Sequence, residues 1–134
     1  MFLTTFCASI AAALLFATTA FAADPPQQKP GDWTVKDFRF HTGEVLPELK
    51  LHYVTIGEPT GEPVMVLHGS NGSGQTMLGR NFAGELFGPG QPLDAARYFV
   101  IVPDALGSGQ SSKPSNGLRM AFPKFTYEDQ VRAQ

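Results

Sequence analysis

Apolar and polar side chains alternate along two stretches in the first half of the chain. Residues 33–40 read WTVKDFRF and residues 48–58 read ELKLHYVTIGE, and both are rich in β-branched and aromatic residues. In the second stretch Leu49, Leu51 and Tyr53 share one side, as in a strand with one buried face. The turn sequence HTGEVLP joins the two stretches. The pattern therefore predicts an antiparallel hairpin.

The pattern then changes from alternation to unbroken apolar runs. Residues 64–67 read VMVL and residues 98–102 read YFVIV. Such runs are typical of central parallel strands that helices cover on both faces. The thirty residues between the runs are enough for a right-handed crossover, with a helix predicted over residues 76–87. Together with the hairpin, these elements predict an α/β fold.

The last ten residues, FTYEDQVRAQ, have the signature of a helix start. Thr126 is followed three residues later by Asp129, a pair that resembles a capping box, and Glu128 lies in the first turn, where the helix dipole favours a negative charge. The pattern reaches Gln134 without a C-cap. We therefore expect this helix, and with it the domain, to be incomplete.

The N-terminal residues have the composition of an export leader. Residues 1–22 contain no charged side chain, an apolar stretch IAAALLFA and the small-residue sequence AFA, which predicts a cleaved signal peptide. A stable membrane anchor is disfavoured because the stretch is rich in Ala and Thr and has no basic flank. Residues 23–32 are rich in Pro and Gln and predict a linker, followed by a partial domain over residues 33–134. The protein is expected to be periplasmic or secreted.

Charge and cysteine content narrow the possible functions. The formal net charge is −2, with a pI near 5.8, so nucleic-acid binding has little support and a small-molecule partner is expected. The one cysteine, Cys7, lies in the leader, so the mature chain would have no disulfide and no thiol nucleophile. The three histidines do not have metal-ligand spacing. No metal or other cofactor is predicted, and the oligomeric state is not indicated.

Two loops rich in glycine and serine, HGSNGSG and PDALGSGQSS, follow the two buried strands. Ligands of open α/β sheets bind beyond the carboxyl ends of the strands, although each loop alone could be an ordinary turn. Phosphate binding is disfavoured because the glycine spacing reverses the dinucleotide fingerprint and no P-loop Lys-Ser/Thr pair follows. Acyl chemistry is favoured, since a small-residue loop can turn backbone amides toward an oxyanion.

These motifs carry a resemblance to a known family. Residues 45–134 resemble the N-terminal part of an α/β-hydrolase-fold protein, with VLHGSNGSG similar to the oxyanion loop and DALGSGQSS matching a D-x-x-G-x-G-x-S pattern. The stretches LFGPGQPLDAARYFVIV and FTYEDQVRAQ are similar to the homoserine O-acetyltransferase branch. The two loops themselves are closer to those of ordinary esterases. The resemblance implies the opening part of an α/β-hydrolase fold, which ends before the nucleophile elbow.

The resemblance also assigns roles to individual residues. The amide of Ser70 would be one oxyanion-hole donor, with Asn71 as the alternative if the loop register differs. The loops would be shaped by five residues: His68, Gly69, Asp104, Gly107 and Gly109. Neither His68 nor Asp104 is expected in the catalytic triad, because in this fold the chain order is Ser, acid, His.

The same order implies that the nucleophile, acid and histidine follow Gln134. The parent protein is then expected to be an exported serine hydrolase that cleaves an ester or related acyl bond. The alternatives are an O-acyltransferase that uses acetyl-CoA, which export disfavours because acyl-CoA is cytoplasmic, and a non-catalytic binding module of the same fold. The 134-residue chain alone is expected to be inactive and prone to aggregation.

Overall fold

The computed structural model describes residues 26–134, so the predicted leader, Cys7 and the start of the predicted linker lie outside the described residues. The strands are β1 (Gln28–Arg39), β2 (Val45–Ile56), β3 (Glu62–Met65) and β4 (Tyr98–Pro103). The helices are α1 (Gly74–Met77), α2 (Arg80–Leu86) and α3 (Tyr127–Ala133), with 3-10 turns η1 (Pro114–Asn116) and η2 (Arg119–Ala121). No helix in residues 26–134 has the length and apolar character needed to cross a bilayer.

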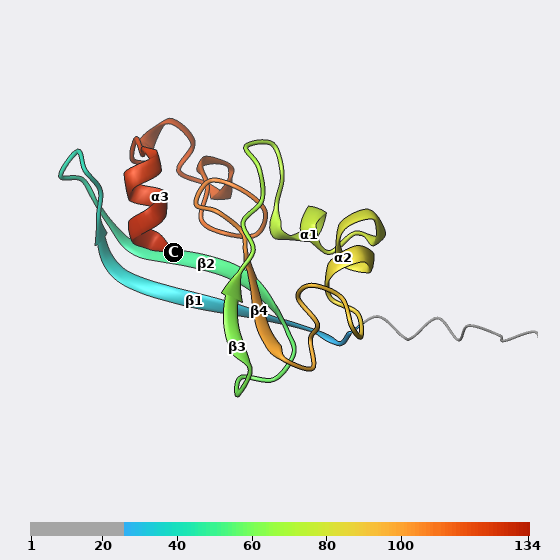
Figure 1. Ribbon diagram of the computed structural model, residues 1–134. Helices are drawn as coiled ribbons and strands as arrows, with labels where there is room; N and C mark the ends of the chain where they lie inside the picture. Colours follow the sequence, from blue (N-terminus) through green and yellow to red (C-terminus); the bar gives the residue numbers. More distant parts are fainter. Residues whose placement is uncertain (1–25) are drawn as a thin grey trace, which may run out of the picture.

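The four strands form one mixed sheet in the order β1-β2-β4-β3. β1 and β2 are an antiparallel hairpin, β2 and β4 are antiparallel, and β3 and β4 are parallel. The predicted fold class, with an antiparallel opening and a parallel pair after it, is confirmed. The loops that follow β3 and β4 emerge at the same end of the sheet, close to α3 (Figure 1).

Several predicted bounds differ from the structure. The strand predicted over residues 64–67 is β3, which begins at Glu62 and ends at Met65. β1 begins at Gln28, inside the predicted linker of residues 23–32. The strand includes Pro30, which is tolerated because β1 is an edge strand and needs ladder hydrogen bonds on one side only. The single helix predicted over residues 76–87 is two short helices, α1 and α2. They are separated because Gly79 has an extended conformation, with ψ of 152°.

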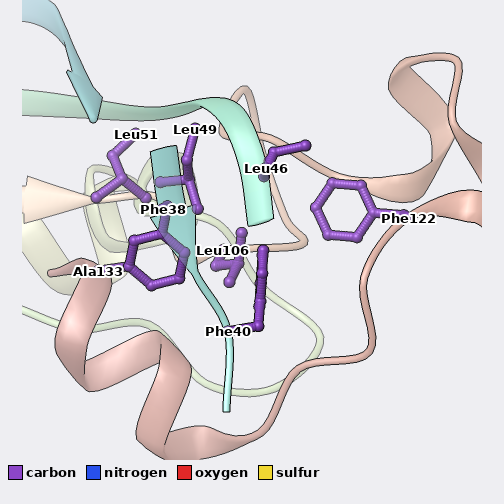
Figure 2. Packing of buried hydrophobic residues seen from close by; sticks show 8 residues of the cluster. All are labelled: Phe38, Phe40, Leu46, Leu49, Leu51, Leu106, Phe122 and Ala133. Atoms are coloured by element: carbon purple, nitrogen blue, oxygen red, sulfur yellow. The ribbon is translucent and has the colours of Figure 1, made fainter. Parts of the chain in front are cut away.

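One hydrophobic cluster lies between the hairpin, α3 and the chain that follows β4. Figure 2 shows its side chains gathered against β2 and α3. Leu49 and Leu51 enter this cluster from the same face of β2, as the alternating pattern predicted. The buried members are Phe38, Phe40, Leu46, Leu49, Leu51, Leu106, Phe122 and Ala133. This cluster places the start of α3 beside the loop that contains Leu106.

A second hydrophobic cluster lies between the sheet and the two short helices. It contains Val54 and Ile56 of β2, Val100 and Val102 of β4, and Leu78 and Phe87 from the crossover. The other face of the parallel pair is less covered, since Met65 is 46% exposed and Leu67 is 55% exposed. The prediction that both apolar runs are covered on both faces is therefore wrong for the described residues. The reason is that α1 and α2 both pack on one face.

The predicted helix start at Thr126 is confirmed, and a buried carboxylate anchors it. Thr126 and Asp129 form a capping box. Asp129 is fully buried and accepts hydrogen bonds from the amide of Thr126 (3.0 Å) and the amide of His41 (2.8 Å). Its Oδ2 also lies 2.6 Å from Nδ1 of His41. His41 thus ties the hairpin turn to α3.

The environment of Asp129 predicts acid sensitivity at this contact. Burial raises the pKa of the Asp129 carboxyl, but the hydrogen bonds from Thr126 and His41 outweigh burial and lower the pKa from 3.8 to about 2. An unfolded chain therefore binds more protons than the folded one between these values. The stabilisation is present above about pH 4 and is lost as the pH falls through the folded value.

We expect the free energy of unfolding, measured with urea at a series of pH values, to fall between pH 4 and pH 2. In Asp129→Asn this part of the pH dependence should be absent, because the group no longer titrates. Glu128→Gln is the matched control, since Glu128 is an exposed carboxylate in the same helical turn. Equal acid sensitivity in Asp129→Asn and the unsubstituted protein would contradict this assignment.

Candidate functional site

Asp104 joins the two glycine-rich loops at the carboxyl end of the sheet. It follows β4 directly and is 4% exposed. Its Oδ1 accepts the amide hydrogen of Gly74 (2.6 Å), and its Oδ2 accepts that of Gln110 (2.7 Å). The sequence predicts a loop-shaping role for Asp104. In the structure it bridges both loops, because Gly74 at the start of α1 lies against the end of β4.

Two glycines in the loop after β4 are required by the backbone and by the space around them. Gly107 has φ of +91°, and a Cβ there would lie 2.6 Å from the ring of Phe125. Gly109 has φ of +52°, and a Cβ there would lie 2.0 Å from the carboxylate of Asp104. A larger residue would meet both a strained conformation and a clash. These positions therefore have the loop-shaping geometry that the sequence suggests.

The loop after β4 is also fastened to β2. Ser111 is fully buried, and its Oγ accepts the amide hydrogen of His52 (2.9 Å) and donates to the carbonyl of Asp104 (2.8 Å). Next to it, Oγ of Ser112 accepts the amide hydrogen of Lys50 (2.9 Å). The pairing of β2 with β4 ends at Pro103. Beyond this point the two hydroxyls accept the amide hydrogens of β2 in place of strand carbonyls. The loop is thereby held rigidly beside the sheet.

His68 links the same two loops from the other side. Its Nε2 accepts the amide hydrogen of Ala105 (3.0 Å) and lies 3.1 Å from Oγ of Ser108. An amide can only donate, so Nε2 carries no hydrogen and Nδ1 carries it, donating to the carbonyl of Gly69 (2.8 Å). His68 is therefore a neutral positioning group whose acceptor nitrogen is already occupied by the backbone.

A pocket of about 550 Å³ opens between the two loops and the start of α3. Ser70 lines it, whereas Asn71 does not. Within residues 26–134 neither of their amides has a hydrogen-bond partner. The lining residues are His68, Gly69, Ser70, Ala105, Leu106, Gly107, Ser108, Phe125, Thr126, Tyr127 and Gln130. Both glycine-rich loops thus face one shared space.

Gly69 begins a tight turn, in which its carbonyl accepts the amide hydrogen of Gly72 (2.9 Å). Its φ is not positive, and a Cβ there would have no neighbour within 4 Å. The space beside Gly69 belongs to the pocket. A small residue here leaves the backbone open to a bound molecule.

The α3 side of the pocket was not predicted from the sequence. Phe125, Tyr127 and Gln130 come from a segment more than fifty residues after Ser70. The similarity of FTYEDQVRAQ to one enzyme branch was the available signal, but it identified a helix rather than a pocket wall.

In the described part of the chain, the side chains of Ser108 and His68 are the one serine and histidine joined by a hydrogen bond, and no carboxylate contacts His68.

Comparison with known proteins identifies the architecture. No family model matches the chain. It is 35% identical to the homoserine O-acetyltransferase of Haloferax prahovense, in an alignment that covers 75% of this chain and 28% of that protein. It is 37% identical to the enzyme of the same name from Moorella thermoacetica, in an alignment that covers 69% of this chain and 30% of that protein. The chain thus spans about a third of the length of these curated relatives.

Solved structures agree with this comparison. A homoserine O-acetyltransferase from Staphylococcus aureus superposes with a TM-score of 0.62 and 25% identity, over 80% of this chain and 33% of that one. The acetyl esterase MekB superposes with a TM-score of 0.67 and 25% identity, over 79% of this chain and 31% of that one. This chain has the α/β-hydrolase fold. It resembles the N-terminal part of the homoserine O-acetyltransferases, and the predicted resemblance is confirmed.

The bridge made by Asp104 gives a test of how the hydrolase-fold loops are held. In Asp104→Asn one oxygen becomes an NH2 group that faces a backbone amide hydrogen, so one hydrogen bond is lost and two donors oppose each other. We expect the free energy of unfolding in urea to fall by about 2–4 kcal/mol. Asp37→Asn, at an exposed carboxylate on β1, should change it by less than about 0.5 kcal/mol. Equal effects of the two substitutions would refute the bridge.

Proposed function

We propose that this chain supplies the oxyanion loop and part of the acyl pocket of an exported, serine-dependent hydrolase that cleaves an ester or related acyl bond of a small molecule. The observation that carries the proposal is the position of Ser70. Its amide has no partner within residues 26–134, and Ser70 lines the pocket of about 550 Å³ between the two loops. Such an amide is the donor that a tetrahedral oxyanion requires.

The rigidity of the loops supports this role. An oxyanion hole is effective because its donors are fixed before the charge develops. Here His68 holds the strand end that precedes Ser70 against Ala105, and Asp104 holds Gly74 after it. The loop is therefore fixed on both sides of the proposed donor. Asn71 is the less favoured donor because it does not line the pocket.

The remaining machinery is proposed to come from polypeptide outside this chain. In this fold the serine nucleophile, the acid and the histidine follow in that order after the oxyanion loop. The matched region is 28–30% of the length of the curated relatives. Within residues 26–134, His68 has its acceptor nitrogen occupied by the amide of Ala105 and is not oriented by an acid. These observations support a donor loop and a pocket wall as the contribution of the described residues. We propose that without the other groups this chain is inactive.

Acyl transfer is the second candidate function. The names of the relatives favour it, since several are homoserine O-acetyltransferases. In both reactions a serine oxygen would attack the acyl carbon and release the alcohol or thiol, and the acyl group would then pass to water or to an alcohol. Hydrolysis is preferred because the leader over residues 1–22 is proposed to direct export, away from acyl-CoA.

The role of the Ser70 amide can be tested by removing its hydrogen. Ser70→Pro deletes the donor, whereas Ser70→Ala keeps the amide and removes the hydroxyl. We expect Ser70→Pro to lower kcat for ester hydrolysis by the full-length protein by about 100-fold or more, with KM less affected, and Ser70→Ala to change kcat little. Equal kcat values for the two variants, with unfolding transitions that match the unsubstituted protein, would exclude Ser70 as a donor. The same pair at Asn71 tests the alternative.

The reaction itself can be assigned from product formation. The full-length protein is incubated with an acetate ester, and separately with acetyl-CoA and homoserine, while free acetate and O-acetyl product are measured. We expect ester hydrolysis to exceed acetyl transfer. Acetylated product that far outruns hydrolysis would overturn the preference for hydrolysis. Activity in neither assay, from a protein that contains the predicted nucleophile, would overturn both functions.

A further inference from the structure

A second cavity adjoins the proposed acyl pocket. It has a volume of about 560 Å³, and Phe125 lines both cavities. Its lining residues are Pro114, Ser115, Arg119, Met120, Phe122, Pro123, Lys124 and Phe125. Phe122 and Phe125 pack edge to face with ring centroids 6.1 Å apart, so the shared wall is a rigid aromatic surface. The two cavities therefore adjoin at Phe125.

The second cavity combines an apolar lining with an excess of positive charge. Between Asp104 and Glu128 the sequence contains three cations, Lys113, Arg119 and Lys124, and no Asp or Glu. The chain as a whole has a net charge of −2, so this segment is positively charged within a chain that is negatively charged overall. Arg119 and Lys124 both line the cavity, and neither has an acidic partner within residues 26–134. Two cations beside an apolar wall match an aliphatic chain that ends in an anion.

The backbone supports this interpretation at Arg119. Its φ is +48°, in the left-handed region that residues other than glycine rarely occupy. Conformations of this kind are concentrated at ligand clamps, where the surrounding structure imposes them. The neighbouring Met120 is 99% exposed. Exposure of an apolar side chain to water does not stabilise the fold. Both features belong to η2, the turn that forms one side of the cavity.

We infer that the second cavity is a specificity subsite for the carboxylate end of the substrate, with Arg119 and Lys124 as its binding groups. This inference rests on the proposed function, because it places the reacting ester in the first cavity. The substrate class is then an acyl ester whose non-reacting end is an aliphatic carboxylate. A single carboxylate suits Arg119 and Lys124, since a guanidinium can bind both carboxylate oxygens and the lysine ammonium adds a second positive charge.

The test compares two esters that differ only in charge. The acetate esters of 6-hydroxyhexanoate and of 6-hydroxyhexanamide have the same length and the same reacting group. With the full-length protein we expect kcat/KM to be about tenfold higher for the carboxylate, the difference that a charged hydrogen bond provides. Arg119→Gln and Lys124→Gln should each reduce this preference, and the double variant should abolish it.

Arg80→Gln is the matched control, because it removes one exposed positive charge from α2, outside both cavities. If it reduces the preference as much as Arg119→Gln does, the effect is one of overall charge and the subsite is refuted. Equal turnover of both esters by the unsubstituted protein also refutes the subsite, while leaving the proposed function supported.

Turnover of neither ester would count against the proposed function, and binding would then decide the subsite. In calorimetry, the unsubstituted protein should bind free 6-hydroxyhexanoate more tightly than 6-hydroxyhexanamide. The double variant should not bind 6-hydroxyhexanoate. Undiminished binding by the double variant, or no binding by the unsubstituted protein, would overturn the inference.

Discussion

The buried carboxylate of Asp104 is the constraint on which the candidate site depends. It takes one amide hydrogen from each of two loops that are far apart in sequence, at Gly74 and Gln110. A buried carboxylate is stable only when such donors surround it. Each loop therefore needs the other for its conformation, and the parallel pairing of β3 and β4 brings them to the same end of the sheet.

His68 and Ser111 extend this constraint outward. His68 joins the strand end before Ser70 to Ala105, and Ser111 joins the loop after β4 to β2. The proposed oxyanion donor thus lies on a loop with fixed points on both sides, while its own amide has no hydrogen-bond partner within residues 26–134. Preorganisation of this kind is the main physical requirement for stabilising charge in a transition state.

The first hydrophobic cluster positions the other side of the site. Leu106 packs with the hairpin and with Ala133 of α3, so the loop after β4 and the last helix are placed by one core. The contact between His41 and Asp129 fixes the start of α3 on this core. Phe125, just before that start, lines both the proposed acyl pocket and the cavity lined by Arg119 and Lys124. Under the proposed function, this short segment would contact both the reacting group and the far end of the substrate.

The sequence by itself determined the fold class, the hairpin, the parallel pair and the helix start at Thr126. These features are local: alternation, apolar runs and capping chemistry are properties of neighbouring residues. It also pointed to the loop after β4, because glycine at 107 and 109 indicates backbone conformations that no larger residue adopts without strain.

What the tertiary structure decided was which distant groups meet. Asp104 bonds to Gly74, thirty residues before it, and His41 bonds to Asp129 at the other end of the domain. One wall of the pocket is formed by Phe125, Tyr127 and Gln130, which are distant in sequence from Ser70 on the facing loop. It likewise decided that α1 and α2 pack on one face of the sheet and leave Met65 and Leu67 exposed. A single sequence has no pattern that records such pairings, because they depend on how elements stack in space.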